Sequence, residues 1–88
     1  MNDYPSQKEV ERIKKMYPKG TRIQIERMND TYHPIERGTK GTVDYVDDIG
    51  TLHCTFDNGR CQGVVTDTDI FHVIDRLNAP IAERYAYL

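Results

Sequence analysis

Residues 51–65, TLHCTFDNGRCQGVV, carry the clearest β-hairpin signal in the chain. Apolar residues alternate with polar ones before the turn, at Leu52, Cys54 and Phe56. This alternation is the period of a half-buried strand. Asn58-Gly59 then supplies the positive φ angles that a tight turn between two strands needs. The stretch therefore predicts two antiparallel strands that face a core on one side.

Five short strands are predicted along the chain, over residues 21–27, 40–46, 51–56, 60–65 and 70–74. Ile23 and Ile25 share one face of the first strand, and Val43 and Tyr45 share one face of the second. A long loop separates these two strands, and a single 3₁₀ turn precedes the last one. The fold class is therefore mainly β, and the order is typical of an SH3-like barrel, a bent antiparallel sheet closed on itself. Such closure removes exposed strand edges.

A helix is predicted over residues 6–17, before the first strand. Ser6 suits the N-cap position, and Glu9 three residues later completes a capping box. The helix has one narrow apolar stripe, formed by Val10, Ile13 and Tyr17. Pro18 ends the helix because proline disfavours helical geometry in the residue before it.

The length of 88 residues corresponds to a single domain with one small core. Its predicted parts are the N-terminal helix over 6–17, the barrel over 20–74 and a short C-terminal helix over 78–87. Asn78 can cap this last helix, and Pro80 is tolerated in its first turn.

The formal net charge of −2 argues against a general nucleic-acid binder. The charge is uneven along the sequence, however. Residues 1–40 hold 9 basic and 6 acidic side chains, a balance of +3, and residues 41–88 hold 3 basic and 8 acidic ones, a balance of −5. If this polarity survived folding, one charged surface could steer a partner. The candidate basic surface lies on the N-terminal helix, at Lys8, Arg12, Lys14 and Lys15.

The N-terminus, MNDYPSQKEVERIKK, is polar throughout and does not resemble a secretion signal. The apolar runs are only a few residues long, too short to cross a membrane. Two cysteines without a secretion signal are expected to stay reduced. We therefore expect a cytoplasmic protein with no membrane partner.

The glycine-rich stretch GTKGTV, residues 38–43, does not match a phosphate-binding loop. Such a loop needs GxxxxGK[ST] between a strand and a helix, and neither the spacing nor the helix is present. Gly38 and Gly41 are instead predicted to let the chain turn sharply from the long loop into the second strand.

Cys54, Cys61, His33, His53 and His72 supply the residue types of a metal or thiol site. A two-residue turn would place both cysteines on the same sheet face, where we expect two small buried side chains. There is no CxxC pair and no histidine pair at helical spacing. No nucleophile–base pair or pair of carboxylates at catalytic spacing stands out. The sequence thus predicts no metal, no cofactor and no enzymatic activity.

Residues 28–37 are the predicted binding site of the barrel. In peptide-binding SH3 domains the matching loop flanks an aromatic groove. Here Tyr32, His33 and Pro34 stand in an otherwise polar segment, with no evident duty in the core. The alternative is that Tyr32 and Ile35 fold back and cap the open end of the barrel.

Tyr45, Asp47 and Asp48 form the second part of the predicted site. Tyr45 is expected close to the long loop. The two aspartates belong to an acidic set that would suit a basic groove on another protein. The alternative for them is structural, because aspartate at turns commonly caps backbone groups.

Several stretches together resemble a known group of domains. They are YPKGTRIQI, MNDTYHPI, GTKGTV, VDDIGTLHCTFDNG and a final DxDxF. Over residues 17–74 the chain resembles a small family of uncharacterised SH3-like domains, found mainly on phages and bacterial mobile elements. The resemblance implies the fold and a setting inside a bacterial host cell, and it implies no mechanism. The N-terminal helix and both cysteines lie outside the shared pattern.

The expected function is a non-enzymatic binding module of phage or mobile-element type, which binds and inhibits a host protein of bacterial defence. Two alternatives stay open. The first is an oligomeric binder of a nucleotide signal or another small ligand. Its homodimer surface would be built from the helical apolar residues Val10, Ile13, Ile81 and Tyr85. The second is a nucleic-acid-binding accessory domain that uses the basic helix and loses affinity steeply with salt.

Overall fold

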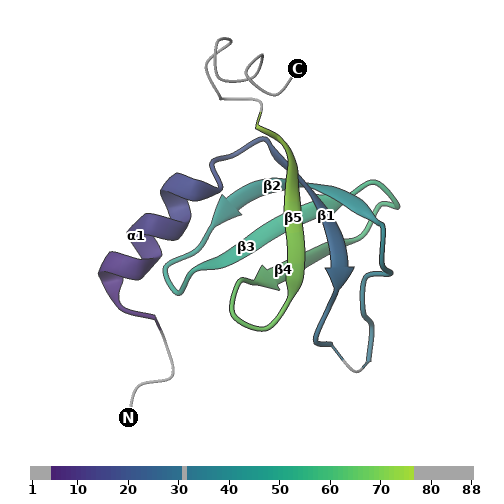
Figure 1. The fold of residues 1–88 in the computed structure, drawn as a ribbon, viewed down its shortest axis with the longest axis horizontal. Coiled ribbons are helices and arrows are strands. Elements are labelled where there is room, and N and C mark those ends of the chain that lie inside the picture. The colour runs from purple at the N-terminus through teal and green to yellow at the C-terminus, as the bar shows by residue number, and fades with distance from the viewer. Residues whose placement is uncertain (1–4, 31, 77–88) are drawn as a thin grey trace.

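The computed structural model describes residues 5–30 and 32–76. One helix precedes five strands (Figure 1): α1 (Gln7–Met16), β1 (Thr21–Arg27), β2 (Lys40–Val46), β3 (Thr51–Phe56), β4 (Cys61–Val65) and β5 (Ile70–Arg76). The predicted N-terminal helix and the five predicted strands are thereby confirmed. The predicted C-terminal helix over residues 78–87 lies outside the described residues. No helix in the described part of the chain is long and apolar enough to span a membrane.

The five strands form one antiparallel sheet in the order β4-β3-β2-β1-β5. The sheet bends strongly, so that β1 and β5 cross in front of the other strands in Figure 1. β4 and β5 are its edges, and no pairing joins these two strands. The sheet is therefore open, and the predicted closure into a barrel is not confirmed.

The β3–β4 hairpin has a three-residue turn, not the predicted two-residue turn. The Phe56 N–H donates to the Arg60 carbonyl at 2.7 Å, and the Gly59 N–H donates to the Phe56 carbonyl at 2.9 Å. Gly59 has a φ of 91°, which suits the left-handed last position of a three-residue hairpin loop. Thr55 therefore lies opposite Cys61. Because a shift of one residue reverses the facing of a strand, Cys61 is exposed, and the prediction of two buried cysteines on one face is wrong.

A β-bulge at Asp44 reverses the facing of the end of β2. Val43 pairs with Cys54, yet Tyr45 pairs with His53, so β2 has one more residue than β3 across this interval. Val43 is completely buried, whereas Tyr45 is 55% exposed. The prediction that Val43 and Tyr45 share a face is therefore wrong.

The apolar core lies inside the bend of the sheet, and α1 packs against it. The buried residues are Ile13, Ile23, Ile25, Ile35, Val43, Leu52, Cys54, Phe56 and Val64. Ile13 reaches the β2–β3 turn at Gly50, where a Cβ would lie 3.0 Å from its Cδ1 atom. Val10 is buried as well. The two helical residues thus serve the core of their own chain, and their predicted use as a dimer surface is wrong.

The start of α1 follows the sequence prediction in part. The Ser6 Oγ accepts a hydrogen bond from the Glu9 N–H at 3.1 Å, which confirms the N-cap. The Glu9 carboxylate pairs with Arg12 one turn later. Glu9 therefore forms an ion pair along the helix in place of the second capping-box bond, in which its carboxylate would accept from the Ser6 N–H.

The two glycines of GTKGTV have different roles. Gly38 has a φ of 88°, and its N–H donates to the Ile25 carbonyl at 2.7 Å, so it turns the long loop into β2 as predicted. Gly41 does not have a positive φ. It lies opposite Phe56, and a Cβ at this position would stand 2.5 Å from the Phe56 Cδ1 atom. Gly41 therefore makes room for the aromatic ring.

Candidate functional site

The long loop, residues 28–39 between β1 and β2, is organised around Asp30. The Asp30 Oδ1 atom accepts hydrogen bonds from the backbone N–H groups of Tyr32, at 2.8 Å, and His33, at 3.1 Å. These two backbone bonds hold the pKa of Asp30 below its ordinary value, although partial burial opposes them. The carboxylate thus fixes the backbone that carries the predicted binding residues.

Arg60, just before β4, and Gln62, in β4, hold the same part of the loop. The Arg60 guanidinium donates to the His33 carbonyl at 2.7 Å and to the Pro34 carbonyl at 3.2 Å. The Gln62 Nε2 donates to the Asp30 Oδ2 at 3.1 Å. The loop tip is therefore tied to the first residues after the β3–β4 hairpin turn.

The anchored tip presents Tyr32 to solvent. The Tyr32 side chain is 86% exposed, whereas Ile35, three residues later, is 2% exposed and belongs to the core. His33 and Pro34 are exposed beside Tyr32. Of the two residues that were candidates for capping the core, only Ile35 does so. We refer to Tyr32, His33 and Pro34 as the tip surface.

Asp69 ties the base of the long loop to the β4–β5 turn. Its Oδ1 accepts from the Asn29 N–H at 2.7 Å, and its Oδ2 accepts from the Val65 N–H at 2.8 Å. Asp69 is 8% exposed. An open surface pocket of about 310 Å³ lies next to it, with Met28 and Gln62 also in its lining. This volume is at the low end for small-ligand sites, about 300–1,000 Å³.

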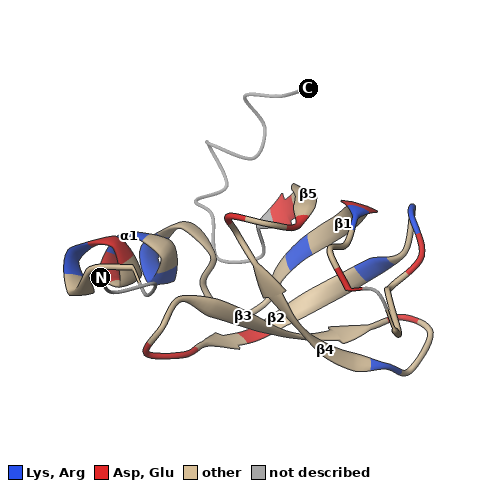
Figure 2. Ribbon diagram, turned by 90° about the horizontal axis from the view of Figure 1, so that it is seen from below, with Lys and Arg blue, Asp and Glu red and all other residues tan. Residues whose placement is uncertain are grey.

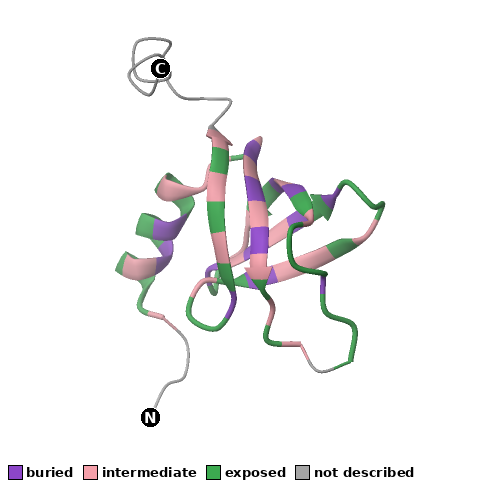
Figure 3. Cartoon of the chain, turned by 45° about the vertical axis from the view of Figure 1, so that its right-hand side comes forward, coloured by how far each residue is buried: buried purple, intermediate pink, exposed green. Residues whose placement is uncertain are grey.

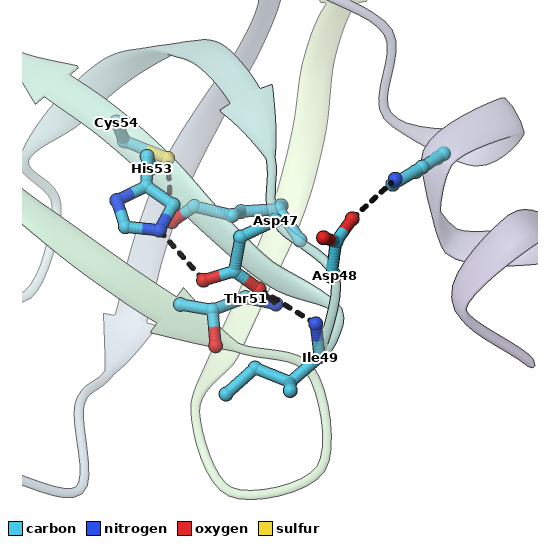
Figure 4. A network of polar contacts seen from close by, with 8 residues as sticks. Asp47, Asp48, Ile49, Thr51, His53 and Cys54 are labelled. Atoms are coloured by element: carbon cyan, nitrogen blue, oxygen red, sulfur yellow. Dashed lines mark hydrogen bonds and ion pairs between the residues drawn. The ribbon is translucent and has the colours of Figure 1, made fainter. Parts of the chain in front are cut away.

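Tyr45, His53 and Asp47 form a second cluster, on the outer face of the sheet. The Tyr45 and His53 rings are stacked, with centroids 4.4 Å apart and planes 5° from parallel. The His53 Nε2 lies 2.8 Å from the Asp47 Oδ2 (Figure 4). The Asp47 Oδ1 accepts from the N–H groups of Ile49 and Thr51 at 3.0 and 2.9 Å. Asp47 thus caps the β2–β3 turn, which bears out the structural alternative for this residue.

The structure does not bring the two parts of the predicted site together. The tip surface is tied to Arg60, which precedes β4. Asp47 is tied to Thr51, whose partner in the sheet is Val65 at the other end of β4. Five residues of extended strand span about 17 Å. The tip surface and the Tyr45 cluster are therefore separate surfaces.

The candidate basic surface on α1 is interrupted by acidic partners. Arg12 pairs with Glu9, and Lys14 lies 3.3 Å from the Asp48 carboxylate. Lys8 and Lys15 are exposed. Figure 2 shows acidic as well as basic bands on α1. Asp48 thus belongs to an ion pair with the helix and does not contact the tip surface.

A second ion pair joins the basic and acidic parts of the sequence. The Arg22 guanidinium donates to both carboxylate oxygens of Asp57, at 2.8 and 2.7 Å. Like the pair between Lys14 and Asp48, it connects residues 1–40 to residues 41–88. The polarity of the sequence is therefore partly neutralised by contacts within the fold.

The two cysteines have opposite environments. Burial raises the pKa of the Cys54 thiol to about 12, so this thiol stays protonated and unreactive. Cys61 is exposed on the outer face, 3.7 Å from the Thr55 hydroxyl. Among the described residues there is no group of three or more His, Cys, Asp or Glu side chains that could hold a metal ion.

The acid sensitivity of the fold provides a test of the Asp47 cap. Burial raises the pKa of Asp47, but hydrogen bonds from His53, Thr51 and Ile49 outweigh burial and leave the pKa below its ordinary value. A lowered pKa stabilises the fold above the pKa of the unfolded chain, about 3.9. This stabilisation disappears as the pH falls through the folded-state value. Asp47→Asn should therefore be less stable than the natural chain at pH 6, and the difference should vanish near pH 2.

Urea denaturation at several pH values between 2 and 7 checks this result. Asp48→Asn is the matched control, because the Asp48 side chain is 100% exposed and only a surface ion pair is lost. A difference for Asp47→Asn that persists unchanged at low pH would contradict the assignment of the stabilisation to the ionised carboxylate.

Sequence reasoning missed the residues that position the site. Arg60 and Gln62 were assigned only to a strand, His53 to a strand and to the set of residues considered for a metal site, and Asp69 to the final DxDxF stretch of the resemblance. The contact of Arg60 with the loop depends on the three-residue hairpin turn, which the Asn-Gly signal does not specify. One of these residues could have been found from the sequence. His53 alternates with the apolar residues Leu52 and Cys54, so its side chain is expected on the outer face of the sheet.

The chain was compared with known proteins. Residues 6–74 match the family model described as Domain of unknown function (DUF4314). No curated protein and no solved structure matches the chain. The match begins at Ser6 and so includes α1, which the resemblance seen in the sequence left outside its pattern. Because the match spans more than half of the 88 residues, the chain belongs to the DUF4314 family, a domain of unknown function.

Proposed function

We propose that the chain is a non-enzymatic binding module with an SH3-like architecture, and that the tip surface binds a partner protein. One observation carries this proposal. Tyr32 is 86% exposed on a backbone that Asp30 and Arg60 hold in place.

Three properties of the tip surface support a role in recognition. Tyrosine is enriched among the residues that dominate binding energy at protein interfaces. A loop that is already held by hydrogen bonds has less conformational entropy to lose on binding. Ile35 supplies the apolar anchor of the loop, so the core does not need Tyr32. The Tyr32 ring is therefore available to a partner.

The arrangement of strands supports the SH3-like assignment. The order of five strands along the chain, with a long loop after β1 and a short turn before β5, agrees with the order expected for this fold class. The long loop corresponds to the loop that flanks the peptide groove in SH3 domains. The phage or mobile-element setting implied by the resemblance makes a host defence protein the expected partner, and its inhibition the expected effect.

The test is affinity capture of the tagged full chain from a bacterial lysate, with and without nuclease. Tyr32→Ala should abolish capture of a stoichiometric protein, or weaken its affinity at least about tenfold, because a central aromatic anchor is lost. Its melting temperature should stay unchanged, because the side chain has no contact in the core. Tyr45→Ala is the matched control, a second exposed tyrosine on a separate surface.

Each other outcome contradicts the proposal. Capture that survives Tyr32→Ala would remove the tip surface from recognition. Capture that disappears with nuclease would favour a nucleic-acid module. A bound nucleotide without any protein would favour the small-ligand alternative, with the open pocket beside Asp69 as its candidate site.

A further inference from the structure

The β-bulge in β2 places two consecutive side chains on the outer face of the sheet. Elsewhere buried and more exposed bands alternate along the strands (Figure 3), because consecutive side chains point to opposite faces. At the bulge, the Asp44 Oδ2 accepts a hydrogen bond from the Thr55 hydroxyl at 2.6 Å, and Tyr45 stacks on His53. Thr55 and His53 are both outward residues of β3, since Cys54 between them is buried. The bulge therefore brings a carboxylate and an aromatic ring together on one face.

The Tyr45 ring is held in place by its neighbours. His53 covers one face of the ring, with the two planes 5° from parallel. The His53 ring is fixed in turn by Asp47, which accepts from two backbone N–H groups of the β2–β3 turn (Figure 4). Tyr45 nevertheless remains 55% exposed. Its uncovered part is a preorganised aromatic surface, which has little conformational entropy to lose on binding.

The Asp44 carboxylate has no cationic partner in the described part of the chain. Asp44 is exposed, and none of the ion pairs there includes it. The Thr55 hydroxyl is a neutral donor, so the negative charge is not compensated. Burial and, after it, the Asp44 charge raise the pKa of the Cys54 thiol to about 12, so the charge acts on the neighbouring strand. We refer to Asp44 and Tyr45 as the bulge surface.

The bulge surface has the chemistry that recognises an arginine side chain. A guanidinium group is planar and positively charged, so it stacks on an aromatic face and is attracted by the ring electrons. Its N–H groups also form charge-assisted hydrogen bonds with a carboxylate. A lysine ammonium group lacks the planar surface for stacking. A nucleic-acid backbone has the same sign of charge as Asp44 and would be repelled.

We propose that the bulge surface binds an arginine side chain of a partner protein, with the guanidinium group stacked on Tyr45 and hydrogen-bonded to Asp44. The bulge surface is separate from the tip surface, so this partner is a second one. The proposal therefore does not depend on the function proposed above. Its test uses a defined peptide instead of capture from a lysate, so that failure of one proposal leaves the other to be judged on its own result.

NMR titration of the full chain with short peptides tests the proposal. The probe is the tripeptide Gly-Arg-Gly with both ends blocked, which carries only the guanidinium charge. Gly-citrulline-Gly is the matched control for charge, because citrulline keeps the planar shape and is neutral. Gly-Lys-Gly keeps the charge without the planar group. The arginine peptide should bind most tightly of the three, with the largest amide shifts at residues 44–45 and 53–55.

Substitutions assign the two parts of the contact. Tyr45→Leu should weaken binding of the arginine peptide about two- to fivefold, as expected for a cation–π contact at an exposed site. Tyr45→Phe keeps the ring and should retain binding. Asp44→Asn should weaken binding by a similar factor, since exposed ion pairs are modest, and it should reduce the preference for arginine over citrulline. Glu36→Gln is the matched control, because it removes an exposed carboxylate from the long loop and should leave binding unchanged.

Several results would overturn the proposal. The absence of shifts around residues 44 and 45 at millimolar peptide would do so, and shifts confined to the tip surface would place arginine recognition on the long loop. Equal binding of the citrulline or the lysine peptide would reject recognition of a guanidinium group. Unchanged binding in both Tyr45→Leu and Asp44→Asn would reject the bulge surface as the site.

Discussion

Replacing Gly41 by alanine should lower the free energy of unfolding by about 3 kcal/mol, at the upper end for overpacking of a core. The new methyl group would stand 2.5 Å from the Phe56 Cδ1 atom and 2.8 Å from its Cε1 atom. Phe56 is 2% exposed and enclosed by the core, so the ring has little room to move away. For a domain of this size the total is only about 5–10 kcal/mol. Urea denaturation followed by far-UV circular dichroism measures the loss.

A double-mutant cycle isolates the cause. Phe56→Leu removes the ring atoms that the new methyl group would strike, at the cost of some core packing. In the Phe56→Leu background, Gly41→Ala should therefore cost much less than in the natural chain. Additive losses would show that the glycine is required for another reason.

Replacing Asp69 by alanine should cost about 3 kcal/mol, because hydrogen bonds to a charged acceptor contribute about 1.5–3 kcal/mol each. The substitution removes the acceptor of two backbone N–H groups, those of Asn29 and Val65. It also separates the base of the long loop from the β4–β5 turn. Urea denaturation gives the overall loss, and hydrogen exchange should show that the Asn29 and Val65 amides lose protection beyond the global change.

Asp67→Ala is the control for this prediction. Asp67 lies in the same turn, but its side chain is exposed. A substitution at such a site usually changes stability by less than about 0.5 kcal/mol. Equal losses for the two variants would contradict the role given to Asp69, and so would unchanged exchange at both amides.

The positions of the strands were predictable because each is a short run of alternating residues. Ile23 and Ile25 in β1 and Leu52 and Phe56 in β3 are buried as the alternation indicates. The predicted face of the Tyr45 side chain was wrong, because the backbone inserts one extra residue at the Asp44 bulge. Such insertions depend on contacts between strands, and a pattern along one strand does not contain them.

The candidate site was predictable in composition and not in arrangement. Tyr32 stood out because a polar loop has little use for an aromatic side chain, and its exposure agrees with that reading. Its distance from Tyr45 was not predictable, because it depends on the contact of Arg60 with the loop. That contact connects Arg60 with Pro34 and His33, which precede it in the sequence by 26 and 27 positions.

The ion pairs between Lys14 and Asp48 and between Arg22 and Asp57 also bear on how the chain folds. Each connects the part of the sequence with a balance of +3 to the part with a balance of −5. In the denatured ensemble, which is more compact than a random coil, we expect these two parts to attract each other because their net charges are opposite. The attraction favours early encounters between the segment that becomes α1 and β1 and the segment that becomes β2, β3 and β4. The uneven charge therefore favours contacts between the two halves of the sequence over contacts within each half during the collapse of the chain.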